Sequence, residues 1–471
     1  MKIRLAIFGE NHPHVALSYN NVGFSFRNLG IHQDALKYYG KALKIRKGLF
    51  GENHPDVAQS YSNVGITYGD LGDYQNALEY QEKALNIWIT LFRENHPDIA
   101  LSYDNIGNTY SKLGNNKKAL VFHEKALRIR LNLFGEYHPD VATSYNNVGA
   151  TYSDLGDYQK ALEYQEKALK IWLNLFEECH PNVAISYNNV GCTYGKLGNY
   201  QKELECLEKA LKIKLVLLNE HHPDVATSYN NVGSTYGKLG NYQKALEYEE
   251  KALKIRLALF GEDHPDVVAS YNNIGGTYKK LGDYKKALAY QEKTLNIWLS
   301  LYEENHPNVA IFYNNIGSTY GKLGNHQKAL EYQEKALSIL LSLYKENHPN
   351  VAIFYNNIGS TYSEIGNHQK ALEYQEKALK IWLELRGEIH PDVAASLNEV
   401  SLTLFYLGKY NEGLAYARKA LDCHIRLYGE IDSNVEVLYR NLGAFYTQLG
   451  DEDLAAQCEE KADWIHSELE K

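Results

Sequence analysis

One dipeptide, His-Pro, constrains what this chain can fold into. It occurs ten times at a fixed interval of 42 residues, and no insertion interrupts the series. The histidines of the series are His12, His54, His96, His138, His180, His222, His264, His306, His348 and His390. Because a strict repeat of this length indicates copies of one unit stacked on its neighbours, we expect a single array. The alternative of about three independent domains, which 471 residues would ordinarily suggest, is disfavoured.

The start of each repeat carries the signals of a helix N-terminus. In the sixth repeat, Pro223 suits the first helical turn, where no backbone N–H is needed, and Asp224 follows where the helix dipole favours a negative charge. The eleventh repeat has Asp432 in place of the histidine. Since Asp is a good N-cap, we expect the histidine position to cap the first helix of every repeat.

Two helices joined by a short turn are predicted within each repeat. In the sixth repeat the first helix is expected to run to about Leu239. The dipeptide Gly240-Asn241 then makes the turn, with glycine supplying a left-handed stop. A second, longer helix is expected from about Gln243 to Phe260.

This pattern divides the chain into three segments. Residues 1–11 are interpreted as the remnant of a second helix from a preceding repeat, because MKIRLAIFGE matches LKIRLALFGE at Leu253–Glu262. Residues 12–431 are predicted to form ten tandem 42-residue units. Residues 432–471 are predicted to form an eleventh, divergent and more acidic unit that caps the C-terminal end.

The first helix has two faces when its residues are placed at 100° intervals. One face, which must pack, carries Val225, Tyr229, Val232, Gly233 and Tyr236. The opposite face carries Thr227, Asn230, Asn231, Ser234 and Lys238. In a stacked array such faces line up from repeat to repeat, so this polar surface is the candidate functional site.

An asparagine recurs on the polar face, directly before the apolar-Gly pair of the first helix. The series comprises Asn21, Asn63, Asn105, Asn147, Asn189, Asn231, Asn273, Asn315, Asn357 and Asn441. Because an amide both donates and accepts hydrogen bonds, a ladder of them is able to hold an extended peptide backbone. The alternative is that these amides bond to neighbouring repeats or to water.

A lysine row lies seven residues further along the same face. The row comprises Lys112, Lys196, Lys238, Lys280 and Lys322, and four consecutive repeats carry the last four. Acidic residues, Asp154 and Glu364, flank those four. Such a row favours acidic peptide segments through steering and charge-assisted contacts. The alternative is that the lysines are simply solvated near a helix end.

A tryptophan recurs in the second helix, with a glutamine seven residues earlier. The pairs are Gln81 and Trp88, Gln165 and Trp172, Gln291 and Trp298, and Gln375 and Trp382. Residues seven apart share a helix face, so both are expected to pack against the next repeat. An exposed tryptophan anchor for a partner is the alternative.

The repeat resembles a known family. The pattern Tyr229, Val232-Gly233, Tyr236, Ala245 and Ala252 resembles the tetratricopeptide repeat. The 42-residue length, the HPDVA opening and the NYxKALxxxxKALxI run resemble its kinesin light chain branch. The resemblance implies an all-α, right-handed solenoid of tandem helical hairpins. It also implies that the asparagine before the apolar-Gly pair contacts a bound peptide, and that acidic-aromatic cargo peptides are the type of ligand.

Two functions are therefore considered. The leading hypothesis is a non-enzymatic, kinesin light chain-like cargo adaptor whose groove binds extended acidic segments of partner proteins. A motor heavy chain is not an expected partner, because no heptad region is present. The alternative is a sensor or oligomerisation arm of a larger signalling protein with an upstream switch domain.

Composition excludes other classes. A net charge of -9 disfavours nucleic acid, because phosphate binding needs a basic surface. The five cysteines do not follow the repeat and lack CxxC spacing, which favours reduced thiols in the cytoplasm. No apolar run has the roughly 18 residues of a membrane span. The ten histidines lie too far apart to share a metal ion, and no catalytic motif is present, so neither a cofactor nor an enzymatic activity is expected.

Overall fold

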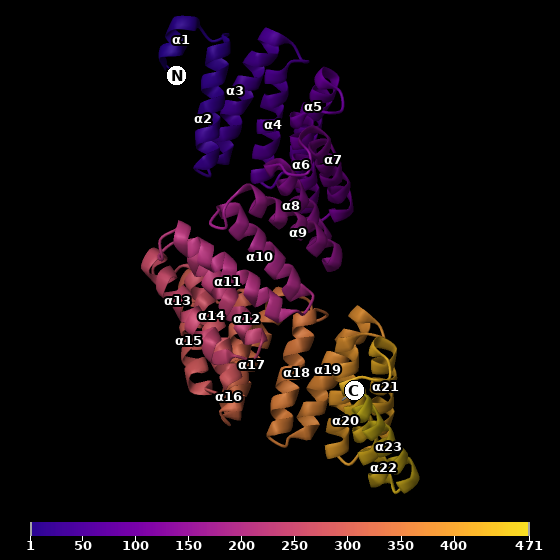
Figure 1. The fold of residues 1–471 in the computed structure, drawn as a ribbon. Helices are drawn as coiled ribbons and strands as arrows, with labels where there is room; N and C mark the ends of the chain where they lie inside the picture. Colours follow the sequence, from indigo (N-terminus) through magenta and orange to yellow (C-terminus); the bar gives the residue numbers. More distant parts are fainter. Residues whose placement is uncertain (1, 470–471) are drawn as a thin grey trace. The chain divides into compact units, whose positions relative to one another are not determined.

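The computed structural model describes residues 2–469, and these residues contain helices but no strand. They divide into two compact units, of which the first ends at Gly240 and the second begins at Asn241. In each unit, most helices pack chiefly against the helix that precedes or follows them in the chain (Figure 1). The predicted all-α fold of tandem helical hairpins is confirmed.

The first unit contains a short N-terminal helix followed by five complete helix pairs and one further first helix. Its helices are α1 (Lys2–Phe8), α2 (Pro13–Asn28), α3 (His32–Phe50), α4 (Pro55–Asp70), α5 (Tyr74–Phe92), α6 (Pro97–Lys112), α7 (Asn116–Phe134), α8 (Pro139–Asp154), α9 (Tyr158–Leu175), α10 (Pro181–Lys196), α11 (Tyr200–Leu217) and α12 (Pro223–Lys238).

The second unit begins with a second helix and continues as five helix pairs. Its helices are α13 (Tyr242–Phe260), α14 (Pro265–Leu281), α15 (Tyr284–Leu301), α16 (Pro307–Lys322), α17 (His326–Leu343), α18 (Pro349–Glu364), α19 (His368–Arg386), α20 (Pro391–Tyr406), α21 (Tyr410–Tyr428), α22 (Ser433–Leu449) and α23 (Glu452–Leu469). The ends predicted for the sixth repeat, near Leu239 and Gln243, are each correct to one residue.

The histidine of each His-Pro pair is the N-cap of a first helix, as predicted. In α12 the backbone N–H of Asp224 donates to Nδ1 of His222 at 3.1 Å, and the same contact opens every first helix from α2 to α20. Asp432 caps α22 through its carboxylate. In several repeats the imidazole adds a contact that aspartate lacks, because it also stacks on an aromatic residue at the end of the preceding helix. Phe50 and His54 lie 4.3 Å apart by ring centroids.

The tryptophan and glutamine of the second helices pack inside the array, which confirms the packing interpretation. Trp88, Trp172 and Trp382 are buried, and Trp298 is half-buried. The glutamine amide reaches the first helix of the next repeat: Thr109 donates its hydroxyl to Oε1 of Gln81 at 3.0 Å. The same contact joins Thr193 to Gln165, Thr361 to Gln333 and Thr403 to Gln375. These side chains fix how one repeat stacks on the next.

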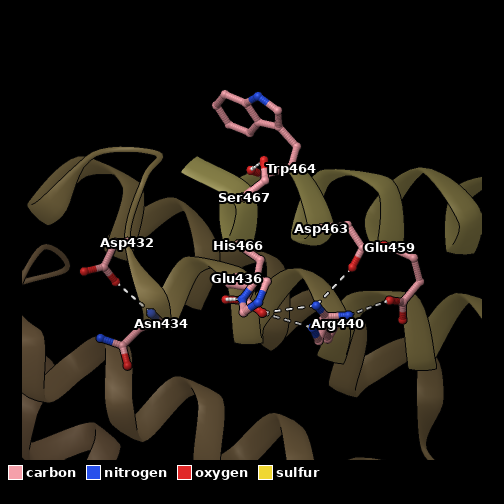
Figure 2. A network of polar contacts seen from close by, with 9 residues as sticks. All are labelled: Asp432, Asn434, Glu436, Arg440, Glu459, Asp463, Trp464, His466 and Ser467. Carbon is pink, nitrogen blue, oxygen red and sulfur yellow. Dashed lines mark hydrogen bonds and ion pairs between the residues drawn. The ribbon is translucent and has the colours of Figure 1, made fainter. Parts of the chain in front are cut away.

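The last hairpin, α22 and α23, is joined by exposed ion pairs (Figure 2). Arg440 on α22 lies 3.0 to 3.1 Å from the carboxylates of Glu436, Glu459 and Asp463. Trp464 on α23 is 40% exposed and points away from this network. Arg440 therefore links α22 to α23 through charged side chains.

Candidate peptide-binding surface

The two faces predicted for the first helix are present in α12. Val225, Tyr229, Val232 and Gly233 are buried, whereas Thr227, Ser234 and Lys238 are exposed. The two asparagines, Asn230 and Asn231, are half-buried at the edge of the exposed side. We call this exposed side, and its equivalents on the other first helices, the polar face.

Three of the predicted groove asparagines, and Asn441 in the last repeat, use their amides to join adjacent repeats. Each donates from Nδ2 to Oδ1 of the first asparagine of the preceding repeat: Asn63 to Asn20 at 2.8 Å, Asn231 to Asn188 at 3.4 Å, and Asn357 to Asn314 at 3.0 Å. Asn441 donates in the same way to Asn398 at 3.2 Å. This is the arrangement that the alternative reading anticipated. Because an amide carries two N–H groups and a carbonyl, each side chain retains hydrogen-bonding capacity beyond this contact.

Asn105 differs from those three, because its Nδ2 is buried without a hydrogen-bond partner. It borders a cavity of about 330 Å³ in the first unit, together with Asn108, Thr109 and Lys112 of α6. Asp70 of α4 lines the same cavity. The polar face is therefore hollowed here, and Asn105 lies at the edge of the hollow with its Nδ2 buried.

The remaining predicted asparagines lie on the same helix side. Asn147, Asn189 and Asn315 are half-buried, and Asn21 and Asn273 are exposed. Each lies on its first helix at the position that Asn231 occupies on α12. Their backbone carbonyls accept hydrogen bonds within the helix, as Asn147 does from the Thr151 hydroxyl at 2.9 Å.

Lys238 is exposed but is already paired with a carboxylate. Its ammonium lies 2.9 Å from Oε1 and 3.1 Å from Oε2 of Glu203 on α11, a residue that is only 5% exposed. Glu203 stands where the other repeats of this pattern have alanine, for example Ala161 and Ala245. Room for it comes from Gly195, since a Cβ there would lie 2.5 Å from the Glu203 carboxylate.

Lys196, Lys280 and Lys322 are also exposed, but their polar partners differ. Lys196 donates to the Ser153 hydroxyl of the preceding repeat at 2.7 Å. Lys322 lies 3.6 Å from Glu364 of the following repeat. Lys280 is exposed on α14. The lysines are thus not equivalent in their charge environment.

A basic cluster forms in the second unit around a lysine that the sequence pattern did not single out. Lys279, next to Lys280, is half-buried and donates to Ser318 at 2.9 Å. Burial lowers the pKa of Lys279, and the positive charges of Lys322 and Lys280 lower it further. The positive charges of Lys280 and Lys322 therefore both act on Lys279, while Glu364 lies 3.6 Å from Lys322.

Glu203 and Lys279 were both missed by the sequence interpretation. Glu203 carried a signal, because nine of the other ten repeats have alanine at its position and the tenth repeat has Gly413. Lys279 likewise replaces the Gly or Ser found at Gly195, Gly237 and Ser153. Both are changes in a single copy, which the pattern shared by the repeats does not display.

Comparison with known proteins gives a family and a fold. The family model described as tetratricopeptide repeat matches residues 14–90, 62–132, 98–174, 140–215, 204–258, 224–300, 266–342, 309–384 and 392–462. No curated protein sequence matches the chain. The solved structure of the apo form of RapI is similar at a TM-score of 0.58 and 18% identity, and the match covers 79% of this chain and 98% of that one.

Two further solved structures are similar to parts of the chain. A putative kinesin light chain from Podosopora anserina with nearly identical TPR-like repeats is 23% identical, with a TM-score of 0.42 over 44% of this chain and 99% of that one. BtubC (BKLC) from P. vanneervenii is 25% identical, with a TM-score of 0.42 over 53% of this chain and 92% of that one.

Proposed function

Because this chain belongs to the tetratricopeptide repeat family, we propose that it is a non-enzymatic scaffold that binds extended acidic segments of partner proteins on its polar face. The proposed role is that of a kinesin light chain-like cargo adaptor. The observation that supports it most directly is the recurrence of exposed lysines beside half-buried asparagine amides on successive first helices.

The lysines and asparagines have separate roles in this proposal. The asparagine amides that keep hydrogen-bonding capacity contact the peptide main chain without regard to its sequence. Lys196 and the cluster of Lys279, Lys280 and Lys322 attract acidic side chains. Lys238 contributes less, since Glu203 already neutralises it.

The proposed setting is the cytoplasm. All five cysteines are free thiols in the structure. In the part of the chain that the structure describes, every helix is too short or too polar to cross a membrane. Together with the acidic net charge, these features support protein partners in preference to nucleic acid or membrane.

We also propose that the three predicted segments have different structural roles. Residues 1–11 complete the packing of the first repeat, residues 12–431 form the repeated array, and residues 432–471 close its C-terminal end. Residues 1, 470 and 471 of these segments lie outside the residues that the structure describes. The exposed ion pairs of Arg440 support the last of these roles, because a terminal repeat needs a polar outer surface.

A charge-reversal experiment tests acidic-peptide binding. The probe is a fluorescein-labelled, glutamate-rich peptide titrated with the full chain and followed by fluorescence anisotropy. The variant K196E/K238E/K280E/K322E is expected to weaken binding by about tenfold or more, because four attractive contacts become repulsive. The matched control is K170E/K212E/K254E/K380E, which reverses four exposed second-helix lysines and changes the net charge equally. An equal loss in both variants contradicts a specific polar face.

The substitution Glu203→Ala provides a gain-of-binding test. It restores the alanine of the other repeats and releases Lys238 from its carboxylate partner. We expect the Glu-rich peptide to bind roughly two- to fivefold more tightly, the range of a single exposed charge pair. Unchanged affinity in E203A, together with unchanged affinity in K238E, removes Lys238 from the proposed site.

A further inference from the structure

The tenth repeat contains a cavity of about 440 Å³ that lies apart from the polar face. It is lined by α19, α20, α21 and the loop between α19 and α20, all within the second unit. Its apolar wall includes Leu379, Val393, Leu397 and Tyr416. Glu388 and Lys419 also line it, so the cavity combines an apolar interior with one carboxylate and one ammonium group.

Two single-copy substitutions account for the cavity. Leu397 stands where all other repeats have tyrosine, namely Tyr19, Tyr61, Tyr103, Tyr145, Tyr187, Tyr229, Tyr271, Tyr313, Tyr355 and Tyr439. Cys423 stands where all other repeats have isoleucine, namely Ile45, Ile87, Ile129, Ile171, Ile213, Ile255, Ile297, Ile339, Ile381 and Ile465. Both replacements remove side-chain volume from the same place, because both residues line the cavity.

The groups that surround the tyrosine in the other repeats are retained in the tenth. The eighth repeat shows the complete arrangement. There the Tyr313 hydroxyl donates to Oε1 of Glu304 at 3.1 Å, and the Lys335 ammonium lies 4.5 Å from the centre of the Tyr313 ring. Lys335 also pairs with Glu304 at 2.6 Å. In the tenth repeat Glu388 and Lys419 occupy the positions of Glu304 and Lys335.

The ninth repeat shows the same arrangement with a longer cation–ring distance. Tyr355 donates to Glu346 at 3.3 Å, and Lys377 lies 5.8 Å from its ring centre. Lys377 also lies 5.3 Å from the ring centre of Tyr374, and the two rings are neighbours with centroids 5.9 Å apart. In the tenth repeat Lys419 keeps the second of these contacts, 5.9 Å from Tyr416, but has leucine in place of the first ring.

We propose that this cavity is a binding site for the tyrosine side chain of a partner polypeptide. The tyrosine ring replaces the one that Leu397 omits, its hydroxyl donates to Glu388, and Lys419 lies over its face. The site discriminates between phenol and benzyl side chains, because a phenylalanine ring leaves the carboxylate without the hydroxyl donor that it has in the eighth repeat.

The surroundings of the cavity favour a polypeptide over a free small phenol. At its mouth Leu383 and Ile389 are 38% and 48% exposed. The two preceding repeats have asparagine in place of Ile389, as Asn305 and Asn347. Exposed Arg418, Asp422 and Arg426 also line it. An apolar centre inside a charged rim, with a pocket for one aromatic anchor, is the anatomy of a protein–protein interface.

The thiol of Cys423 holds the loop beside the cavity. Its Sγ lies 3.4 Å from the carbonyl oxygen of Glu388 and 3.7 Å from that of His390. The shorter cysteine thus leaves space where isoleucine would fill it and also donates to the backbone next to the proposed carboxylate acceptor. The two substitutions act together at one site.

The experiment measures binding of N-acetyl-tyrosine amide to the full chain by ligand-observed NMR titration. We expect saturable binding to the wild-type chain and about tenfold weaker binding, or none, to Leu397→Tyr, which refills the cavity with the ring of the other repeats. L397Y is expected to fold, because Glu388 and Lys419 are already in place to receive the ring. Equal binding to both proteins overturns the proposal. Cys423→Ile fills the same cavity from the other side and gives the same test independently.

Three further arms separate the alternatives. N-acetyl-phenylalanine amide is expected to bind about tenfold more weakly than the tyrosine amide, and equal binding overturns the role of Glu388. Tighter binding of p-cresol than of the tyrosine amide shows that the cavity rejects a peptide main chain and overturns the polypeptide source. The four-lysine variant K196E/K238E/K280E/K322E is expected to bind the tyrosine amide normally, so failure of the polar-face proposal is distinguishable from failure of this one.

A transplanted site provides the matched positive control. The double substitution Y355L/I381C copies both departures into the ninth repeat, where Glu346 and Lys377 are present. We expect a second tyrosine-binding site and therefore a doubled stoichiometry. A folded double variant that retains a single site overturns the inference that the two substitutions create the site.

Discussion

The eighth and tenth repeats share the charged groups that surround one ring, but only the eighth has the ring. Both have the glutamate and lysine that enclose a first-helix tyrosine, as Glu304 and Lys335 in one and Glu388 and Lys419 in the other. The eighth repeat fills the space between them with Tyr313, whereas the tenth has Leu397 and a cavity. Residues shared by all copies therefore build the stack, whereas a substitution in one copy gives that repeat its own local chemistry.

Two other repeats also carry a single-copy substitution, and the neighbouring side chains satisfy the new group to different degrees. In the third repeat Asp104 replaces the usual asparagine or serine, and it accepts from buried Arg130 while lying 3.1 Å from Nδ1 of buried His123. In the sixth repeat Glu249 replaces the usual glutamine, and one of its carboxylate oxygens is buried without a partner. Neighbouring groups thus pair with the carboxylate of Asp104 fully and with that of Glu249 only in part. Nothing fills the space that Leu397 leaves.

The largest loss of stability is expected from removing the charge of Asp104. Asp104→Asn leaves Arg130 and His123 buried without their carboxylate, and loss of one partner of a buried pair costs about 3 kcal/mol or more. Hydrogen exchange of α6 and α7 measures this locally, which suits an array that need not unfold in one step.

The control for this prediction comes from the first repeat. That repeat has Asn20, Tyr39 and Arg46, with Arg46 donating to Ser60 at 2.7 Å. The double variant D104N/H123Y reproduces this combination and is expected to recover most of the lost protection. Full protection in D104N alone shows that the ion pair contributes nothing beyond the serine and carbonyl contacts of Arg130.

The repeated features were predictable from sequence, and the single-copy contacts were not. The caps at His222 and Asp432 and the buried side of α12 follow from local chemistry and helical period, which the sequence displays many times. The contact of Asn63 with Asn20 depends on how closely two repeats approach, and that distance is set by side chains such as Gln81. The pairing of Lys238 with Glu203 joins residues 35 positions apart, so helical period does not place them together.

A smaller, pH-dependent change in stability is expected at Glu249. Burial raises the pKa of Glu249 from 4.5 to about 7, while the hydrogen bond from Thr277 lowers it and the charge of Glu250 raises it further. The folded state therefore binds the proton more strongly than the unfolded state. The stability that this provides is complete below pH 4.5 and is lost as pH rises to about 7, by up to about 3 kcal/mol.

The substitution Glu249→Gln tests this titration, because glutamine occupies the position in five other repeats as Gln81, Gln165, Gln291, Gln333 and Gln375. The Tm of E249Q is expected to exceed that of the wild type at pH 8 and to approach it at pH 5. Comparing the two proteins at each pH cancels the titration of all other groups. A Tm difference that is the same at both pH values contradicts a raised pKa at Glu249.

The smallest loss of stability is expected from giving the eighth repeat the leucine of the tenth. Tyr313→Leu removes a ring that is 5% exposed, together with its hydrogen bond to Glu304, and is expected to destabilise the repeat by about 2 kcal/mol. The pKa of Glu304 is held below its usual value by hydrogen bonds from Lys335 and Tyr313, with Lys335 the larger cause, so the carboxylate stays ionised beside the new vacancy. Hydrogen exchange of α16 and α17 measures the loss, and N-acetyl-tyrosine amide is expected to restore part of it by occupying the space. Protection that falls but does not recover with the tyrosine amide means that the leucine alone does not make the site, and assigns an essential part of the tenth-repeat cavity to Cys423.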